Sequence, residues 1–224
     1  MAGNRLAERP KLSVASAHAA RLAAAGSAGH PYVEDLAGQG ASVIARDFDD
    51  LVHLLCSLYG RHPGIIDLAV TLCSGGAVHD WLSDAANAFE RERLYLVRLT
   101  AAVGPLPSTP GNAETEAALV AQRHALETLA QSERTGCSLG TASALVADWQ
   151  AIRPLLDRSA QRLGLEPPAM ALPDEDSIAD ILELCGSASP AAERAIRFGS
   201  EQLLLQHRAL FDLLEARCDA REGY

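Results

Sequence analysis

Three ionisable residues at core-facing helical positions are the strongest candidates for chemistry in this sequence: Glu92, Asp148 and His207. Each residue of a helix advances about 100° around the axis, and by that phase all three fall on the apolar stripe of their segments. A carboxylate in an apolar core must be ion-paired, protonated or metal-bound. Arg93, beside Glu92, completes the set. These residues predict a ligand-binding site between facing helices, where helical bundles commonly hold their ligands.

Each candidate also has a plainer interpretation as part of a structural core. Glu92 could form an ion pair with Arg93 or with an arginine of another helix. Asp148 could accept a hydrogen bond from a neighbouring indole or pair with an arginine, and His207 could be a neutral histidine satisfied by hydrogen bonds. Asp47 also faces the apolar side of its segment, where it either joins the site or favours the positive end of its helix.

Other pairs with ligand-like spacing face away from the apolar stripe. By helical phase, Asp50 and His53, and likewise His124 and Glu127, are expected to lie in solvent. The sequence contains none of the common catalytic or nucleotide-binding motifs. It also lacks the Glu-x-x-His pair of di-iron bundles. We therefore expect no metal and no cofactor, and leave open whether the protein is an enzyme.

Apolar residues at helical spacing, punctuated by glycine and proline, predict the elements that position these side chains. The expected helices cover 12–25, 42–59, 63–73, 77–103, 113–134, 138–163, 175–185 and 190–220. Period-two alternation of β-branched residues is missing, so no sheet is expected. Pro154 predicts either a kink in 138–163 or two shorter helices. Ser189 is expected to cap the last helix, with Pro190 at its first position.

The predicted fold is all-α: one bundle domain over 31–224, with about four long helices and short accessory ones. Residues 1–30 are expected to form a flexible N-terminal arm that carries the short Ala-rich helix 12–25. Hydrophobic residues make up 48% of the chain but aromatic residues only 4%, so the core must consist mainly of Leu and Ala. Such a core suits closely packed helices.

Charge and cysteine usage narrow the classes of partner and compartment. The formal net charge is −10, which argues against nucleic-acid and anionic-membrane surfaces. Along 190–220, arginines alternate with acidic residues, which is typical of a solvated face or local ion pairs. The five cysteines are widely spaced and include no CxxC, which favours reduced thiols in a cytoplasm. Lys11 is the only lysine, a bias typical of GC-rich bacterial genomes.

The sequence supports two functional hypotheses of different classes. The leading one is a non-catalytic interaction or regulatory module that binds a protein partner or forms a homo-oligomer. It rests on the acidic, Ala- and Leu-rich composition and on the lack of catalytic motifs. The alternative is a bundle that binds a ligand or metal through Glu92, Asp148 and His207. An enzyme with His207 as general base is a variant of that alternative.

Overall fold

The computed structural model describes residues 12–38 and 45–222, and all regular structure within them is helical. This confirms the all-α class. The elements are α1 (Val14–Ala25), the 3₁₀ turn η1 (Ser27–Gly29), α2 (Pro31–Ala37), α3 (Ala45–Tyr59), α4 (Ile65–Thr71), α5 (Ala77–Val103), α6 (Asn112–Ala130), α7 (Cys137–Arg162), α8 (Glu175–Gly186) and α9 (Pro190–Glu222). The short helix α2 and the turn η1 were not predicted.

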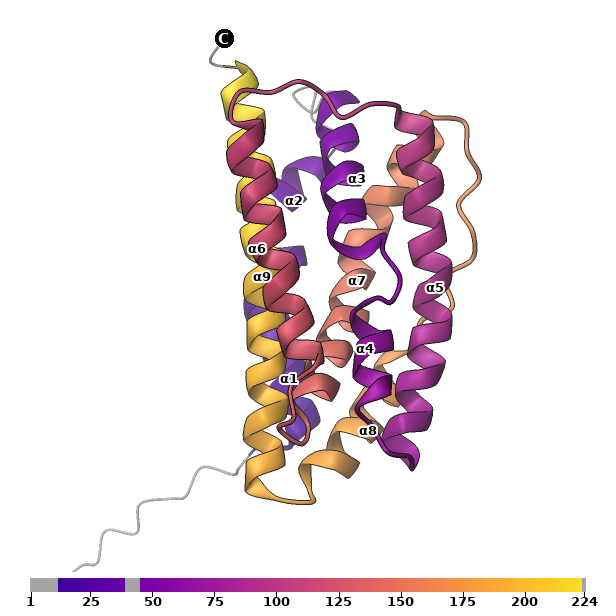
Figure 1. The fold of residues 1–224 in the computed structure, drawn as a ribbon, viewed down its shortest axis with the longest axis vertical. Coiled ribbons are helices and arrows are strands. Elements are labelled where there is room, and N and C mark those ends of the chain that lie inside the picture. Colours follow the sequence, from indigo (N-terminus) through magenta and orange to yellow (C-terminus); the bar gives the residue numbers. More distant parts are fainter. Residues whose placement is uncertain (1–11, 39–44, 223–224) are drawn as a thin grey trace, which may run out of the picture.

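Helix α7 lies at the centre of the molecule. It contacts every other helix of the described chain, and its closest partner is α9. Figure 1 shows α5, α6, α7 and α9 running along the long axis, with α3 and α4 stacked end to end between them. Asp148 and Trp149 are both buried on this central helix. Polar groups on α7 therefore meet side chains from several other elements.

Two glycines allow α7 and α9 to approach each other closely. A Cβ at Gly140 of α7 would collide with the main-chain oxygen of Ile196, and one at Gly199 of α9 would collide with that of Cys137. Such contacts cannot be relieved by rotating a flexible side chain, because the obstructing atoms belong to the backbone. Gly140 and Gly199 are thus both needed for the close packing of α7 against α9.

Helix α1 packs on the bundle, which differs from the expectation of a separate arm. The Ala15 backbone N–H donates to a carboxylate oxygen of Glu183 on α8 at 2.8 Å. The buried His18 side chain lies 3.1 Å from the Ser200 hydroxyl of α9. The many alanines of α1 have short side chains, so the helix can lie close enough to α8 and α9 for these polar contacts to form. The first eleven residues of the predicted arm lie outside the described residues.

The ends and interior of two long helices follow the local chemistry of proline. Helix α7 continues without a break through Pro154, which excludes the alternative of two shorter helices. Helix α9 begins at Pro190, and the Ser189 hydroxyl accepts a hydrogen bond from the Ala192 N–H at 3.1 Å. The predicted cap and first helical position are therefore confirmed.

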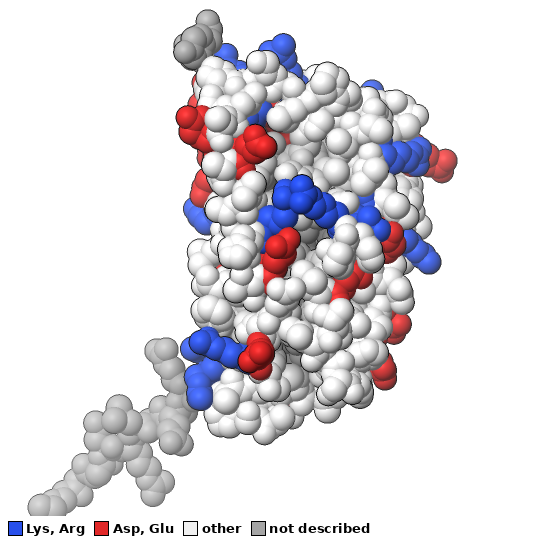
Figure 2. Space-filling model, in the orientation of Figure 1, with Lys and Arg blue, Asp and Glu red and all other residues white. Residues whose placement is uncertain are grey.

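Charged side chains of both signs are distributed over the surface. On the face drawn in Figure 2, Lys and Arg side chains are interspersed with Asp and Glu, and uncharged residues cover most of the area. That face offers no continuous basic patch of the kind that binds nucleic acid. Within the described residues, every helix is too short or too polar to cross a lipid bilayer.

Candidate functional site: a cavity between α1, α7 and α8

The four residues predicted for the site do not all come together. Glu92, Asp148 and His207 are buried, with relative exposures of 1%, 3% and 1%. Arg93 instead pairs with Glu90, three residues earlier on the same helix. Its side chain lies near the surface, so the interior set contains three residues and not four. Only Asp148 and His207 contact each other directly.

Asp148 and His207 belong to a buried chain of hydrogen bonds. His207 Nδ1 lies 2.5 Å from Asp148 Oδ2. On the other side of the ring, Nε2 lies 2.5 Å from the Tyr59 hydroxyl. Asp148 also accepts the Ser27 backbone N–H at 2.7 Å and the Ser27 hydroxyl at 2.5 Å. The chain therefore links η1, α7, α9 and α3 through groups that are all buried.

The environment of this chain fixes which groups hold their protons. Burial alone would raise the pKa of Asp148, but hydrogen bonds and charge from His207, with the two Ser27 donors, bring it below its usual value. Burial, aided by the Asp148 charge, raises the pKa of Tyr59 well above its usual value. Asp148 is thus the ionised acceptor of hydrogen bonds from Ser27 and from His207 Nδ1, and the Tyr59 hydroxyl, which keeps its proton, lies against Nε2 of the same ring.

Glu92 belongs to a second buried cluster beside the first. It accepts the Trp149 indole N–H at 2.9 Å and forms an ion pair with Arg153 of α7 at 2.7 Å. Burial raises the pKa of Glu92, although Trp149 and Arg153 oppose that shift. The Tyr59 ring packs edge-on against Trp149, with centroids 5.5 Å apart. The plainer interpretation of Glu92 thus holds, with an arginine of another helix as its partner.

A third polar cluster corrects two predictions about solvent exposure. Asp50, expected in solvent, is fully buried on α3. Arg217, expected on a solvated face of the last helix, is 2% exposed and binds Asp50 through Nε at 3.1 Å and Nη2 at 2.9 Å. Arg221 pairs with both Asp47 and Asp50. Asp47 therefore joins an ion-pair network that ties α3 to α9, and not the central site.

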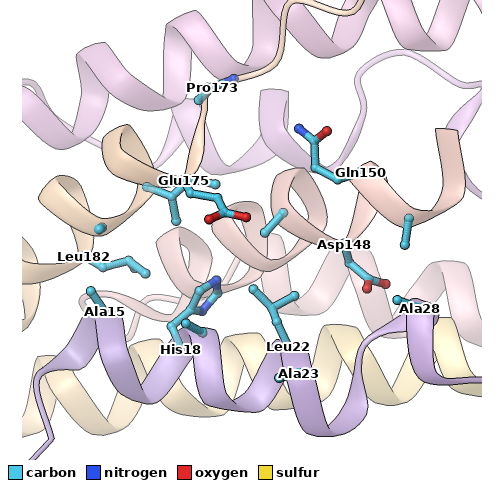
Figure 3. A pocket seen from close by; sticks show the side chains of 15 residues that line it. Ala15, His18, Leu22, Ala23, Ala28, Asp148, Gln150, Pro173, Glu175 and Leu182 are labelled. Atoms are coloured by element: carbon cyan, nitrogen blue, oxygen red, sulfur yellow. The ribbon is translucent and has the colours of Figure 1, made fainter. Parts of the chain in front are cut away.

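A cavity with a volume of about 390 Å³ lies between α1, α7 and α8. Figure 3 shows His18 and Leu22 projecting into it from α1, with Glu175 facing His18 and Asp148 beside Ala28. Most of the remaining lining is apolar, and much of it is alanine. Of the predicted site residues, only Asp148 reaches this cavity. The part of the cavity wall formed by Asp148, here called the floor, therefore adjoins the buried chain of hydrogen bonds that ends at Tyr59.

His18 is the polar group that sequence reasoning missed. It is 3% exposed and lines the cavity, and its Nε2 has no hydrogen-bond partner among the described residues. A signal was present, because Ala15, His18 and Leu22 are spaced three and four apart and so share one helix face. The Ala-rich composition predicts a flexible arm for this helix, and that prediction places no element opposite its His18 face.

His18 makes the stability of the protein depend on pH. Burial, with a smaller contribution from Arg21, lowers its pKa from the usual 6.5 to about 4. The unfolded chain therefore binds more protons between these values, and stability falls as pH decreases from about 6.5 towards 4. We expect a loss of up to about 3 kcal/mol in the free energy of unfolding over that range. Urea denaturation at pH 7.5 and 4.5 measures it.

The matched variant for this prediction is His18→Gln, whose amide can still donate to Ser200 but does not titrate. The additional loss at pH 4.5 should disappear in the variant, since the other titrating groups are unchanged. An equal loss in both proteins would contradict the assignment of the effect to His18.

One group of described residues has the arrangement of a metal site, but its protons argue against one. Ligand atoms of His30, Asp212 and Glu215 lie within 4.8 Å of one another. The Tyr32 backbone N–H donates to His30 Nδ1 at 3.2 Å, so the neutral ring carries its proton on Nε2. That nitrogen faces Asp212 at 3.1 Å. It is engaged as a donor and offers a metal no lone pair.

Comparison with known proteins identifies the family and leaves the activity open. No curated protein and no solved structure matches the chain. A family model described as a family of unknown function matches residues 22–222. The matched range includes Tyr59, Asp148 and His207, whereas His18 lies four residues before the start of that range. Because the match spans most of the sequence, the chain belongs to this family of unknown function, DUF6975.

Proposed function

We propose that this chain is a single-domain bundle of four long helices that binds a small, largely apolar molecule in the cavity between α1, α7 and α8. The observation that carries the proposal is the cavity itself. Its volume of about 390 Å³ falls within the range of roughly 300–1,000 Å³ typical of ligand sites. The lining is mainly apolar with a few polar groups, a composition that such sites share.

The walls of the cavity are suited to hold a ligand in a defined position. Asp148 is fixed by three hydrogen bonds from Ser27 and His207, so the floor is rigid. Alanines of both α1 and α7 line the cavity. Because their side chains are short, the shape of the cavity is set mainly by the positions of the helix backbones. Preorganised walls of this kind reduce the entropy lost on binding.

The geometry favours binding over catalysis. Tyr59 and His207 have relative exposures of only 2% and 1%, and neither lines the cavity. The one member of the buried chain that reaches the cavity is Asp148, whose carboxylate is held by Ser27 and His207 and whose lowered pKa makes it a weak base. His18 does face the cavity, but with a pKa of about 4 it is a weak base at neutral pH. We assign the buried chain to the support of the floor.

Binding is tested with 1-octanol as probe and a substitution that fills the cavity. Ala23 and Ala24 are both exposed on α1, but only Ala23 lines the cavity. At ten times its Kd, a ligand stabilises the fold by about 1.4 kcal/mol, a rise in Tm of roughly 3–6 °C for a chain of this size. Ala23→Phe should abolish the rise and Ala24→Phe should retain it. No rise in the native protein, or an equal rise in both variants, would overturn the proposal.

Association with a protein partner or a second copy of the chain is the second candidate function. Phe198 and Leu205 on α9 are 40% and 53% exposed, and their spacing of seven places them on one side of the helix. Arg134 lies over the Phe198 ring, 5.7 Å from its centroid. If this face binds a second copy, light scattering should show an oligomer that the Leu205→Glu substitution dissociates. A monomeric native protein would exclude self-association through this face.

A further inference from the structure

We propose that the ligand carries an uncharged or cationic N–H or O–H group, which donates a hydrogen bond to Nε2 of His18. This inference rests on the proposed function and defines the chemistry of its ligand. The same cavity should discriminate against ethers, which lack a donor, and against carboxylates. An apolar cavity by itself would suit a fatty acid equally well, so this selectivity is a separate claim.

The position of the His18 proton follows from the neighbouring backbone. The Ser200 hydroxyl donates its only proton to the main-chain oxygen of Gly140 at 3.0 Å. Its oxygen is therefore the acceptor for His18, whose Nδ1 lies 3.1 Å away. Since the neutral ring carries one proton and Nδ1 holds it, Nε2 presents a lone pair.

That lone pair has no hydrogen-bond partner among the described residues. The His18 residue is nevertheless buried, with a relative exposure of only 3%. A buried acceptor without a partner is destabilising. The ring faces the cavity from α1 (Figure 3), so a molecule bound there is positioned to satisfy it. The group that does so must be a donor.

The charges around the cavity decide against an anionic head group. Its lining contains the carboxylates of Asp148 and Glu175 and no Arg or Lys. Glu175 is exposed and faces His18 across the cavity (Figure 3). A carboxylate ligand would lack a donor for His18 and would meet charges of its own sign. An alcohol meets neither obstacle, and an ammonium group gains from the acidic lining.

Four probes with similar apolar bodies separate these possibilities: 1-octanol, octylamine, octanoate and heptyl methyl ether. Isothermal titration at pH 7.5 measures their affinities for the full chain. We expect 1-octanol and octylamine to bind roughly 3- to 10-fold more tightly than the ether, the usual effect of one hydrogen bond. Octanoate should bind most weakly. Of the four probes, only octylamine should bind more weakly at higher salt concentration, because salt screens its attraction to the acidic groups of the lining.

Two variants assign the selectivity to His18. His18→Phe removes the acceptor while keeping an aromatic ring, so the preference for 1-octanol over the ether should vanish. Ser200→Ala frees Nδ1 without altering the cavity lining, and the ring can then present a donor on Nε2, which should also reduce the preference. His124→Phe, at an exposed position of α6, is the matched control and should retain it.

The outcomes separate this inference from the proposed function. Equal affinities for 1-octanol and the ether, or tightest binding of octanoate, would overturn the donor assignment and leave the cavity as a binding site. A preference for 1-octanol that persists in both His18→Phe and Ser200→Ala would also overturn it. Binding of none of the four probes would overturn the proposed function itself.

Discussion

Replacing Asp148 by leucine is expected to lower the free energy of unfolding by about 3–5 kcal/mol. The substitution removes the acceptor of three hydrogen bonds, two from Ser27 and one from His207. Their donors would remain buried, because both residues are almost inaccessible to solvent. The effect should be large because Asp148 lies on α7, which contacts every other described helix. The floor of the cavity would lose its support at the same time.

Urea denaturation monitored by circular dichroism measures this loss, with two variants for comparison. Tyr59→Phe removes only the hydroxyl at the far end of the chain, so it should lower stability by about 1 kcal/mol. Asp212→Leu removes a carboxylate that is 58% exposed and should change stability by less than about 1 kcal/mol. A loss for Asp148→Leu no larger than that of Asp212→Leu would contradict the structural role of the chain.

Replacing Arg217 by methionine is expected to have an effect of similar size, again about 3–5 kcal/mol. Arg217 binds Asp50 through two nitrogens, and Nη1 donates to the Asn112 side chain at 2.8 Å. Asp50 is fully buried, so removal of Arg217 leaves its charge with Arg221 alone. The network joins α3, α9 and the start of α6, and these elements should loosen together.

Two further substitutions on α9 show whether geometry or charge is responsible. Arg217→Lys keeps the charge but cannot form the paired contacts of a planar guanidinium, so it should recover less than half of the loss. Arg197→Met removes an arginine side chain that is 55% exposed and should change stability by less than about 1 kcal/mol. Full recovery by lysine in urea denaturation would show that the paired geometry is unimportant.

Apart from the short helix α2 and the turn η1, the helices could be predicted because their segments carry apolar residues at helical spacing. The same periodicity placed Glu92, Asp148 and His207 in the interior, where the structure has them. Helical phase gives the direction of a side chain but not the element opposite. For that reason, the sequence could not decide whether Glu92 pairs with Arg93 or with an arginine of another helix. Only the fold shows that Arg153 lies within reach.

Two clusters were missed for identifiable physical reasons. Asp50 and Arg217 lie off the apolar stripes of their helices, but α3 and α9 meet there, and reciprocal pairing makes burial of both charges possible. Their separation of 167 residues left no local signal. His18 did carry a local signal, the face it shares with Ala15 and Leu22. Its importance depends on the docking of α1, which an Ala-rich sequence does not specify.

The most direct test of the central claim is to locate a bound probe by NMR. Intermolecular NOEs between 1-octanol and labelled methyl groups should involve residues of the cavity wall, namely Leu22, Ala23, Ile178 and Leu182. The same NOEs should disappear in Ala23→Phe and persist in Ala24→Phe. NOEs confined to the exposed Phe198 and Leu205 face of α9, or no NOEs at saturating probe, would contradict a ligand site between α1, α7 and α8.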